Sequence, residues 1–128
     1  MDLTVVHQQL FEDGFRPVKH TDGSIEFKYE GGTYFVDTDL KDEMYIRVSY
    51  PGFWTPETPI QIGASWEQAG IATESMKAVK VYMHKGKVHC TVEQFLVRPE
   101  DFRLILPRVL SSLQAGVRRF AGLMSTYL

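Results

Sequence analysis

The chain has 128 residues, of which 44% are hydrophobic, with a net charge of −2 and a pI near 6.1. This length fits one domain, residues 1–128, and the near-neutral charge does not indicate a nucleic-acid-binding protein. The single cysteine, Cys90, excludes an internal disulfide; no stretch approaches the ~18 apolar residues of a membrane span, and the N-terminus lacks the basic region and continuous apolar run of a signal peptide. We therefore expect a cytoplasmic protein without membrane contact.

The first predicted element is a helix over residues 2–14. Asp2 is a suitable N-cap, and Gly14 can end the helix in the left-handed conformation that glycine tolerates. The apolar residues recur at helical spacing, which predicts one buried face. That face would carry Leu3, Val6, Leu10 and Phe11.

A β-hairpin follows over residues 24–37. Polar and apolar residues alternate in both arms, and Gly31-Gly32 between them predicts a two-residue turn that pairs Glu30 with Thr33. The packed face would be Ile25, Phe27, Tyr29, Tyr34 and Val36. After a polar turn in "DTDLKDE", residues 44–50 alternate again and predict a third strand.

Residues 49–59, "SYPGFWTPETP", combine three aromatic residues with three prolines and a glycine. Proline and glycine interrupt regular structure, so we expect a connection from the third strand to a second helix. Phe53 and Trp54 have two interpretations: a segment closed over the core just before the helix, or a binding patch. The second interpretation applies mainly to Trp54.

The second helix is expected to begin near Thr55 or Thr58, each of which precedes a proline, and to run to about Thr73. Gly63 and Gly70 are seven residues apart and therefore share a helix face. A face without side chains would let another backbone approach closely.

A second hairpin is predicted over residues 77–97, with Lys85-Gly86 as its turn and His84 paired with Lys87. Its packed face would be Val79, Val81, Met83, Val88, Cys90 and Val92. Residues 99–124 form the clearest helix, with Pro99 at its start and Pro107 inside it, where a kink is expected.

The predicted order is thus helix, three strands, helix, two strands, helix. Five antiparallel strands with helices packed on one face make a two-layer α+β domain. The other face of the sheet would be open to solvent.

The stretch "MKAVKVYMHKGKVHCTVEQFL" followed by "RPEDFRLILPRVLSSLQAGVRRF" resembles the YbjN-like family, and "YEGGTYFV" matches its first hairpin more loosely. That family shares its α-β-β-β-α-β-β-α architecture with the type III secretion chaperones, the Tir-chaperone-like group. The resemblance in topology covers nearly the whole chain. The matching motifs belong to the scaffold of the fold and not to a functional site.

The resemblance implies a small bacterial protein, usually dimeric, without a cofactor. Secretion chaperones of this group hold an extended segment of a partner protein, and YbjN-like proteins are linked to sensory or stress regulation. Two features depart from the chaperones: the two glycines of the second helix, and a net charge that is only mildly negative.

The open sheet face carries the candidate site. Strand alternation places aromatic and basic side chains together there, among the acids Glu26, Asp37 and Glu93. Such a face can be an ordinary solvated surface, can grip a protein partner or a second subunit, or can stack bases and hold phosphates. With Trp54 added, the candidate partner-binding residues are Phe35, Tyr45, Arg47, Trp54, Tyr82, His84, His89 and Phe95.

No catalytic or metal-binding signature is present. Residues 37–43 lack the ligand and glycine that a calcium loop needs at its fifth and sixth positions, and Cys90 and His89 point to opposite faces of their strand. We therefore predict a non-enzymatic, chaperone-like or regulatory module that forms a homodimer and binds a partner protein through the sheet face or the dimer groove, without metal or cofactor. The alternative is a single-stranded nucleic-acid-binding module on the open sheet face.

Overall fold

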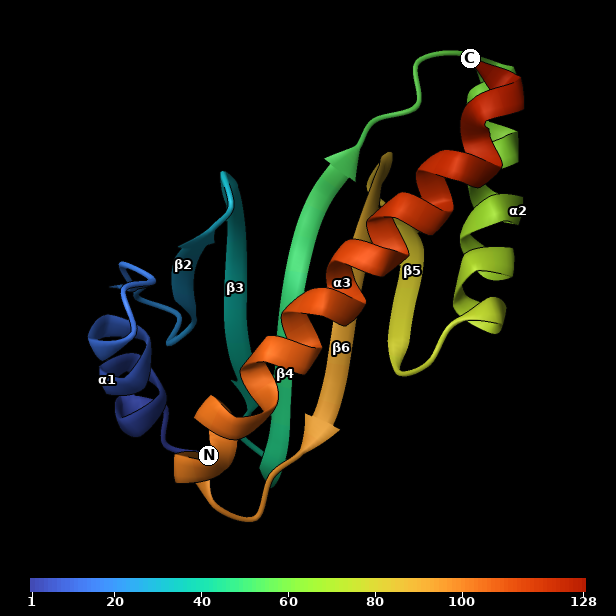
Figure 1. The fold of residues 1–128 in the computed structure, drawn as a ribbon. Coiled ribbons are helices and arrows are strands. Elements are labelled where there is room, and N and C mark those ends of the chain that lie inside the picture. Colours follow the sequence, from blue (N-terminus) through green and yellow to red (C-terminus); the bar gives the residue numbers. More distant parts are fainter.

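The computed structural model describes all 128 residues and forms a sheet with helices on one side (Figure 1). The strands lie in the order β1-β2-β3-β4-β6-β5, and every neighbouring pair is antiparallel. The elements are α1 (Thr4–Glu12), β1 (Val18–Lys19), β2 (Ile25–Tyr29), β3 (Gly32–Asp39), β4 (Asp42–Trp54), α2 (Pro59–Ser75), β5 (Val79–His84), β6 (Lys87–Phe95), the 3-10 turn η1 (Pro99–Asp101), α3 (Phe102–Met124) and the 3-10 turn η2 (Ser125–Tyr127).

The α+β class and the helix order are confirmed, but the sheet has six strands where five were predicted. The additional strand is β1, which is two residues long and pairs only with the start of β2. A strand this short has no alternation that a sequence can display. No helix of the structure combines the length and apolarity that a membrane crossing requires.

The hydrophobic core lies between the sheet and α3, which crosses the sheet diagonally, with α1 near β2 and α2 beside β5 (Figure 1). Its largest fully buried side chains include Phe27, Phe102 and Phe120. The predicted packed faces of both hairpins are confirmed: their side chains are buried, apart from a half-buried Tyr29.

Helix α1 ends at the predicted glycine, but its N-cap residue is Leu3, one residue after the predicted Asp2. The Asp2 carboxylate accepts a hydrogen bond from the Thr4 amide at 2.9 Å, and Gly14 adopts φ +86° after the last turn. The Phe15 amide then donates to the Leu10 carbonyl at 2.9 Å, which closes the helix end. The prediction for Phe11 was wrong: its side chain is 70% exposed, on the rim of the apolar face.

The first hairpin turns at Glu30-Gly31, one residue earlier than predicted. Both turn residues have positive φ, +47° and +79°, as a type I′ turn requires. Tyr29 therefore pairs with Gly32 and Phe27 with Tyr34, a shift of two residues in each partner. Because side chains alternate with a period of two, the shift leaves the same residues on the packed face.

Strand β4 is longer than predicted, because residues 51–54 continue it instead of forming a connection. Tyr50 pairs with Cys90 and Trp54 with Val88, so three residues of β4 stand opposite one residue of β6 in a bulge. The bulge accommodates both Pro51, which has no amide hydrogen, and Gly52, which has φ +63°. The connection to α2 is only residues 55–58.

Helix α2 begins at Thr58-Pro59, one of the two predicted starting points. The Thr58 hydroxyl accepts a hydrogen bond from the Gln61 amide at 3.1 Å, and Pro59 is the first helical residue. Near its end, Thr73 binds the outer edge of β5: its hydroxyl accepts from the Val81 amide at 2.8 Å and donates to the Val81 carbonyl at 2.9 Å.

Within the chain, no other segment packs against Gly63 or Gly70, and a helix glycine lies in close contact with the sheet at Gly116 instead. A side-chain carbon on Gly63 or Gly70 would meet no atom within 4 Å, so this glycine face of α2 is open to solvent. In α3, a side-chain carbon on Gly116 would lie 3.0 Å from Cys90 Sγ and 3.1 Å from Val79. Helix α3 therefore packs closely on the sheet at Gly116, and it runs through Pro107 as one element.

Candidate functional site

The sheet brings most of the predicted site residues together on its open face. Tyr45 stands opposite Phe95, Tyr82 opposite His89, and Arg47 lies between Asp37 and Glu93 in neighbouring strands. Phe95 and His84 are exposed, whereas Phe35, Tyr45, Tyr82 and His89 are half-buried. The predicted grouping is therefore present, except for Trp54.

Ion pairs within this face neutralise its central cation. The Arg47 guanidinium donates two hydrogen bonds to the Asp37 carboxylate, at 2.9 and 2.8 Å. This pairing raises the pKa of Arg47 further, so the side chain stays charged. A bidentate pair of this kind leaves Arg47 with few free donors for a ligand.

Glu93 collects the hydrogen bonds of two neighbours. Tyr45 donates its hydroxyl hydrogen to Glu93 at 2.7 Å, and Lys80 forms a short hydrogen-bonded ion pair with the same carboxylate. The Lys80 contact, followed by the one from Tyr45, lowers the pKa of Glu93. Burial, together with the adjacent Glu93 charge, raises the pKa of Tyr45 to about 12.

The same pairing occurs at the β2 end of the face. Glu26 contacts His20 at 3.2 Å and Lys28 at 3.4 Å, and the pKa of Glu26 is lowered, mainly by the His20 contact. Three basic positions of the open face are thus bound by acids of the same face. This arrangement favours the protein-binding prediction over the nucleic-acid one, because phosphates need unpaired cations.

His89 has both ring nitrogens engaged by the backbone. Nδ1 lies 2.9 Å from the Gly52 amide nitrogen and Nε2 lies 3.0 Å from the His84 carbonyl oxygen. The Tyr82 ring stacks on the imidazole with centroids 5.4 Å apart. His89 therefore connects the β4 bulge with the β5–β6 hairpin.

Trp54 lies on the helix side of the sheet, away from the other predicted site residues. Its ring packs edge-on against Phe120 at 5.6 Å, and Phe53 packs against the same ring at 5.7 Å. Tyr50 stacks between Phe53 at 6.2 Å and Tyr34 at 4.6 Å. The interpretation of Phe53 and Trp54 as a segment closed over the core is confirmed.

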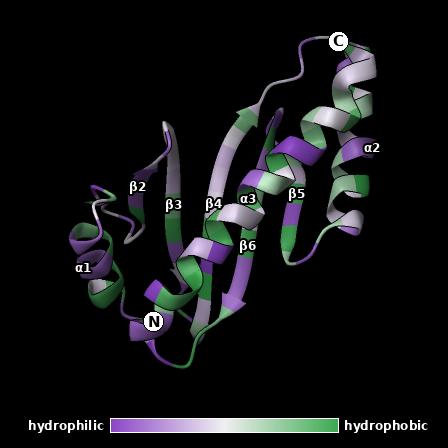
Figure 2. Ribbon diagram, viewed as in Figure 1, coloured by the Kyte–Doolittle hydropathy of each residue, from purple (hydrophilic) through white to green (hydrophobic).

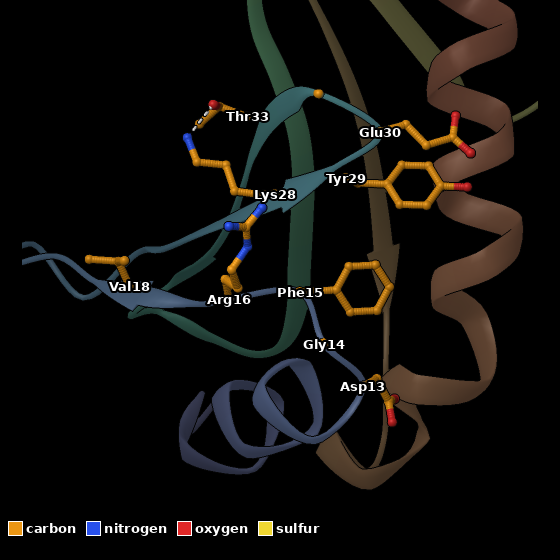
Figure 3. Close-up of a pocket in the computed structure, with 10 residues that line it drawn as sticks. Asp13, Gly14, Phe15, Arg16, Val18, Lys28, Tyr29, Glu30 and Thr33 are labelled. Carbon is orange, nitrogen blue, oxygen red and sulfur yellow. Dashed lines mark hydrogen bonds between the residues drawn. The ribbon is translucent and has the colours of Figure 1, made fainter.

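An open recess of about 650 Å³ lies at the outer edge of β2 (Figure 3). The rings of Phe15 and Tyr29 point to one side of the strand, and Arg16 and Lys28 rise on the other. Arg16 has φ +50°, an uncommon conformation for a residue with a side chain. The lining acids contact other elements: Asp13 binds Arg103 and Glu30 binds Gln114. The recess is lined by Asp13, Gly14, Phe15, Arg16, Val18, Lys28, Tyr29, Glu30, Gly31 and Thr33.

A second recess of about 500 Å³ lies on the open sheet face itself, where Phe35 and Ser49 contribute to the lining beside the Arg47–Asp37 pair. Next to Ser49 across the strands is Thr91, 1% exposed, whose hydroxyl has no hydrogen-bond partner. The small side chains in the middle of the open face are therefore covered by the larger side chains around them.

Cys90 lies on the opposite, packed face. It is fully buried, and burial raises the pKa of its thiol to about 12, so the thiol is neutral at neutral pH. The structure contains no group of three or more His, Cys, Asp or Glu side chains placed to hold a metal ion.

The outer face of α2 was missed by the sequence analysis. Hydrophobic and hydrophilic residues alternate along the α2 ribbon (Figure 2). The buried side of this helix consists of small or polar residues, whereas its large apolar side chains are exposed. Trp66 is 62% exposed and sits between the open positions Gly63 and Gly70. We call the α2 outer face the exposed set Ile60, Ile62, Gly63, Trp66, Gly70 and Ile71.

A signal for this face was present in the sequence. Ala64, Ala69 and Ala72, with Ser65 and Gln68, recur at helical spacing and form the buried side. The two glycines share a face on the opposite side of the helix, so the same helical spacing predicts that both are exposed. A prediction that places large apolar residues on the buried side therefore exchanges the buried and exposed sides of α2.

Comparison with known proteins identifies the fold. No protein-family model and no curated protein matches the chain. Among solved structures, YbjN from E. coli, a candidate transcription regulator, matches with a TM-score of 0.64 and 14% identity over 94% of this chain and 92% of that one. An uncharacterized protein from Methanothermobacter thermautotrophicus matches with a TM-score of 0.57 and 15% identity over 97% and 94%. The chain therefore has a YbjN-like fold.

Proposed function

We propose that the chain is a non-enzymatic protein-binding module that works as a homodimer, and that two copies meet through the α2 outer face. The observation that carries the proposal is the inverted arrangement of α2, with Trp66 exposed and alanines buried. An exposed tryptophan among other exposed apolar side chains is typical of a protein interface.

The spacing of the α2 outer face suits a second copy. Gly63 and Gly70 are about 10 Å apart along the helix, at 1.5 Å per residue. If two α2 helices pack antiparallel about a two-fold axis midway between them, each Gly63 lies across from the partner's Gly70. The missing side chains allow close approach, and the two Trp66 rings come together beside the axis.

Charge limits the strength of this contact. Glu67 and Glu74 lie on the exposed side of α2, neither takes part in a salt bridge, and the helix has no basic residue. Glu67 is next to Trp66, so two-fold pairing brings the two Glu67 carboxylates near each other. Like charges repel, which keeps the dimer reversible.

With α2 occupied by a second copy, the open sheet face stays available for a partner protein. The exposed Phe95 and His84 and the half-buried Tyr45 and Tyr82 would form its contact surface. YbjN, which shares the fold, is a candidate transcription regulator, and a regulatory role for this chain fits that description.

The test is the oligomeric state of Trp66→Ala. We expect the wild-type chain to sediment as a dimer and the variant to dissociate at least about tenfold more readily, because a buried interface tryptophan contributes about 2 kcal/mol or more. Leu104→Ala is the matched control, since Leu104 is 77% exposed on α3. Glu67→Gln should strengthen the dimer by removing repulsion.

A wild-type chain that remains monomeric at high micromolar concentration would overturn the dimer. Equal dissociation of the wild type, Trp66→Ala and Leu104→Ala would place the interface elsewhere. Circular dichroism of each variant verifies that the fold is retained.

A further inference from the structure

His89 makes the one side-chain hydrogen bond between the β5–β6 hairpin and the bulge of β4. The Gly52 amide and the His84 carbonyl bind its two ring nitrogens at 2.9 and 3.0 Å. None of the salt bridges of the structure involves this ring. The His89 side chain thus binds backbone atoms of two separate segments.

These two bonds fix the protonation of the imidazole. A backbone amide only donates, so Nδ1 must carry a lone pair and no hydrogen. A backbone carbonyl only accepts, so the hydrogen of the neutral ring must lie on Nε2. The neutral Nε2–H form satisfies both contacts, whereas an imidazolium carries a hydrogen on Nδ1 that points at the Gly52 amide hydrogen.

The side chains around the ring are aromatic or basic. On β5, Tyr82 stacks on the ring and the His84 ring lies 6.0 Å away. On β6, Lys87 extends along Gly52, its Cδ 3.5 Å from the position where a Gly52 side chain would begin. The carboxylate of this face of β6, Glu93, is bound by Lys80 and Tyr45. A second positive charge at His89 would have no carboxylate to bind.

The hydrogen bond between Gly52 and His89 also affects the residues that follow Gly52 in β4. Gly52 has φ +63° in the middle of the bulge, and the next two residues, Phe53 and Trp54, pack edge-on against Phe120. Beyond them only residues 55–58 separate β4 from α2. Without the His89 contact, the bulge stays attached to β6 only through the pairings on either side of it, Tyr50 with Cys90 and Trp54 with Val88, so the aromatic end of β4 is held less firmly.

We propose that His89 is a proton-operated latch: its neutral ring holds the β4 bulge closed, and protonation releases Gly52 and exposes the apolar surface of Phe53 and Trp54. Imidazole changes charge in the range from about pH 8 to pH 5, which gives the latch a physiological trigger. The latch is independent of the α2 outer face and of the proposed dimer.

The experiment follows single amides by NMR from about pH 8 to pH 5. Long-range 15N–1H spectra should show the neutral His89 ring with its hydrogen on Nε2. As the ring protonates, the exchange protection of the Gly52 amide, corrected for the intrinsic rate, should fall about fivefold, the factor for one hydrogen bond of about 1 kcal/mol. The Trp54 indole N–H resonance should shift with it as the ring leaves Phe120, while the Val48 amide in the middle of β4 should keep its protection.

Two variants separate the latch from general acid destabilisation. His89→Asn places an uncharged oxygen near the position of Nδ1, so Gly52 should stay protected down to about pH 5. His89→Phe removes the acceptor, so protection of Gly52 should be low throughout. His84→Asn is the control: the side chain changes while the backbone carbonyl that binds His89 remains, and the wild-type pH profile is expected.

The latch is wrong if Gly52 keeps its protection while the His89 ring protonates. It is equally wrong if the neutral ring carries its hydrogen on Nδ1. A loss of protection that His89→Asn shares with the wild type would assign the pH dependence to other groups.

Discussion

At the residue scale, Cys90 has the largest consequence for pH dependence. The unfolded thiol has a pKa near 8.5, and burial raises the folded value to about 12. The folded state therefore binds the proton more tightly. The resulting stabilisation is complete below the unfolded pKa and is lost as pH rises toward the folded one.

We expect the free energy of unfolding to fall by about 1 kcal/mol per pH unit above about pH 9, with Cys90 responsible for the first part of the decline. Urea titrations at successive pH values measure it. In Cys90→Ala the decline should begin only above about pH 10, where Tyr34 and Tyr45 take over, because burial raises the pKa of each to about 12. An unchanged slope between about pH 9 and pH 10 in Cys90→Ala would contradict this assignment.

Residue facing could be predicted from sequence because strands alternate with a period of two. This is why Cys90 and Phe35 were assigned to the correct faces of the sheet. The position of the turn at Glu30-Gly31 could not be predicted. A glycine pair favours a turn at Gly31-Gly32, whereas in the structure Glu30 is a turn residue with φ +47°. The cost of one residue in a left-handed conformation is offset by contacts far away in sequence.

At the element scale, the two glycines of α3 have opposite roles. Gly116 lies against Cys90 and Val79, and Gly122 has open space. Alanine favours helix over glycine by about 1 kcal/mol at either position. Only at Gly116 does the added carbon push the helix away from the sheet.

Gly116→Ala should therefore lower the unfolding free energy by about 1 kcal/mol net, since overpacking costs about 1–3 kcal/mol. Gly122→Ala, the matched control, should raise it by about 0.5–1 kcal/mol. Chemical denaturation measures both. Adding Cys90→Ala to Gly116→Ala should recover part of the loss; shifts of equal sign in the two single variants would show that the contact is not tight.

Element positions were predictable where a local signal exists, as at the Thr58-Pro59 start of α2. The extension of β4 through Pro51 was not, because the bulge depends on pairing with β6, a segment distant in sequence. The orientation of α2 depends likewise on which side β5 and α3 cover. The open sheet face was predictable as a grouping, but its ion pairs depend on side-chain geometry.

At the scale of the whole molecule, Gln9 joins the first helix to the last. Its side-chain amide donates to the Glu100 carbonyl at 2.8 Å, and its oxygen accepts from the Arg103 amide at 3.0 Å. Arg103 in turn binds Glu12 and Asp13 on α1. Because Gln9 is nearly buried, water cannot readily replace these bonds.

Gln9→Leu should lower the unfolding free energy by about 1–3 kcal/mol, since the Glu100 carbonyl and the Arg103 amide lose their partners. Hydrogen exchange should show the loss first in α1. Gln8→Leu, at an exposed neighbouring position, is the control and should leave α1 protected. If both variants exchange alike, the clamp does not hold α1.

The hydroxyl of Thr73 has a consequence for behaviour at high concentration. Strands with free edges can recruit further chains edge to edge without limit, which is how fibrous aggregates grow. In this molecule α2 occupies part of one margin of the sheet through Thr73, and β1 occupies part of the other. The pairing that we propose through α2 is two-fold and stops at two copies, so on that proposal crowding should yield small closed assemblies instead of fibres.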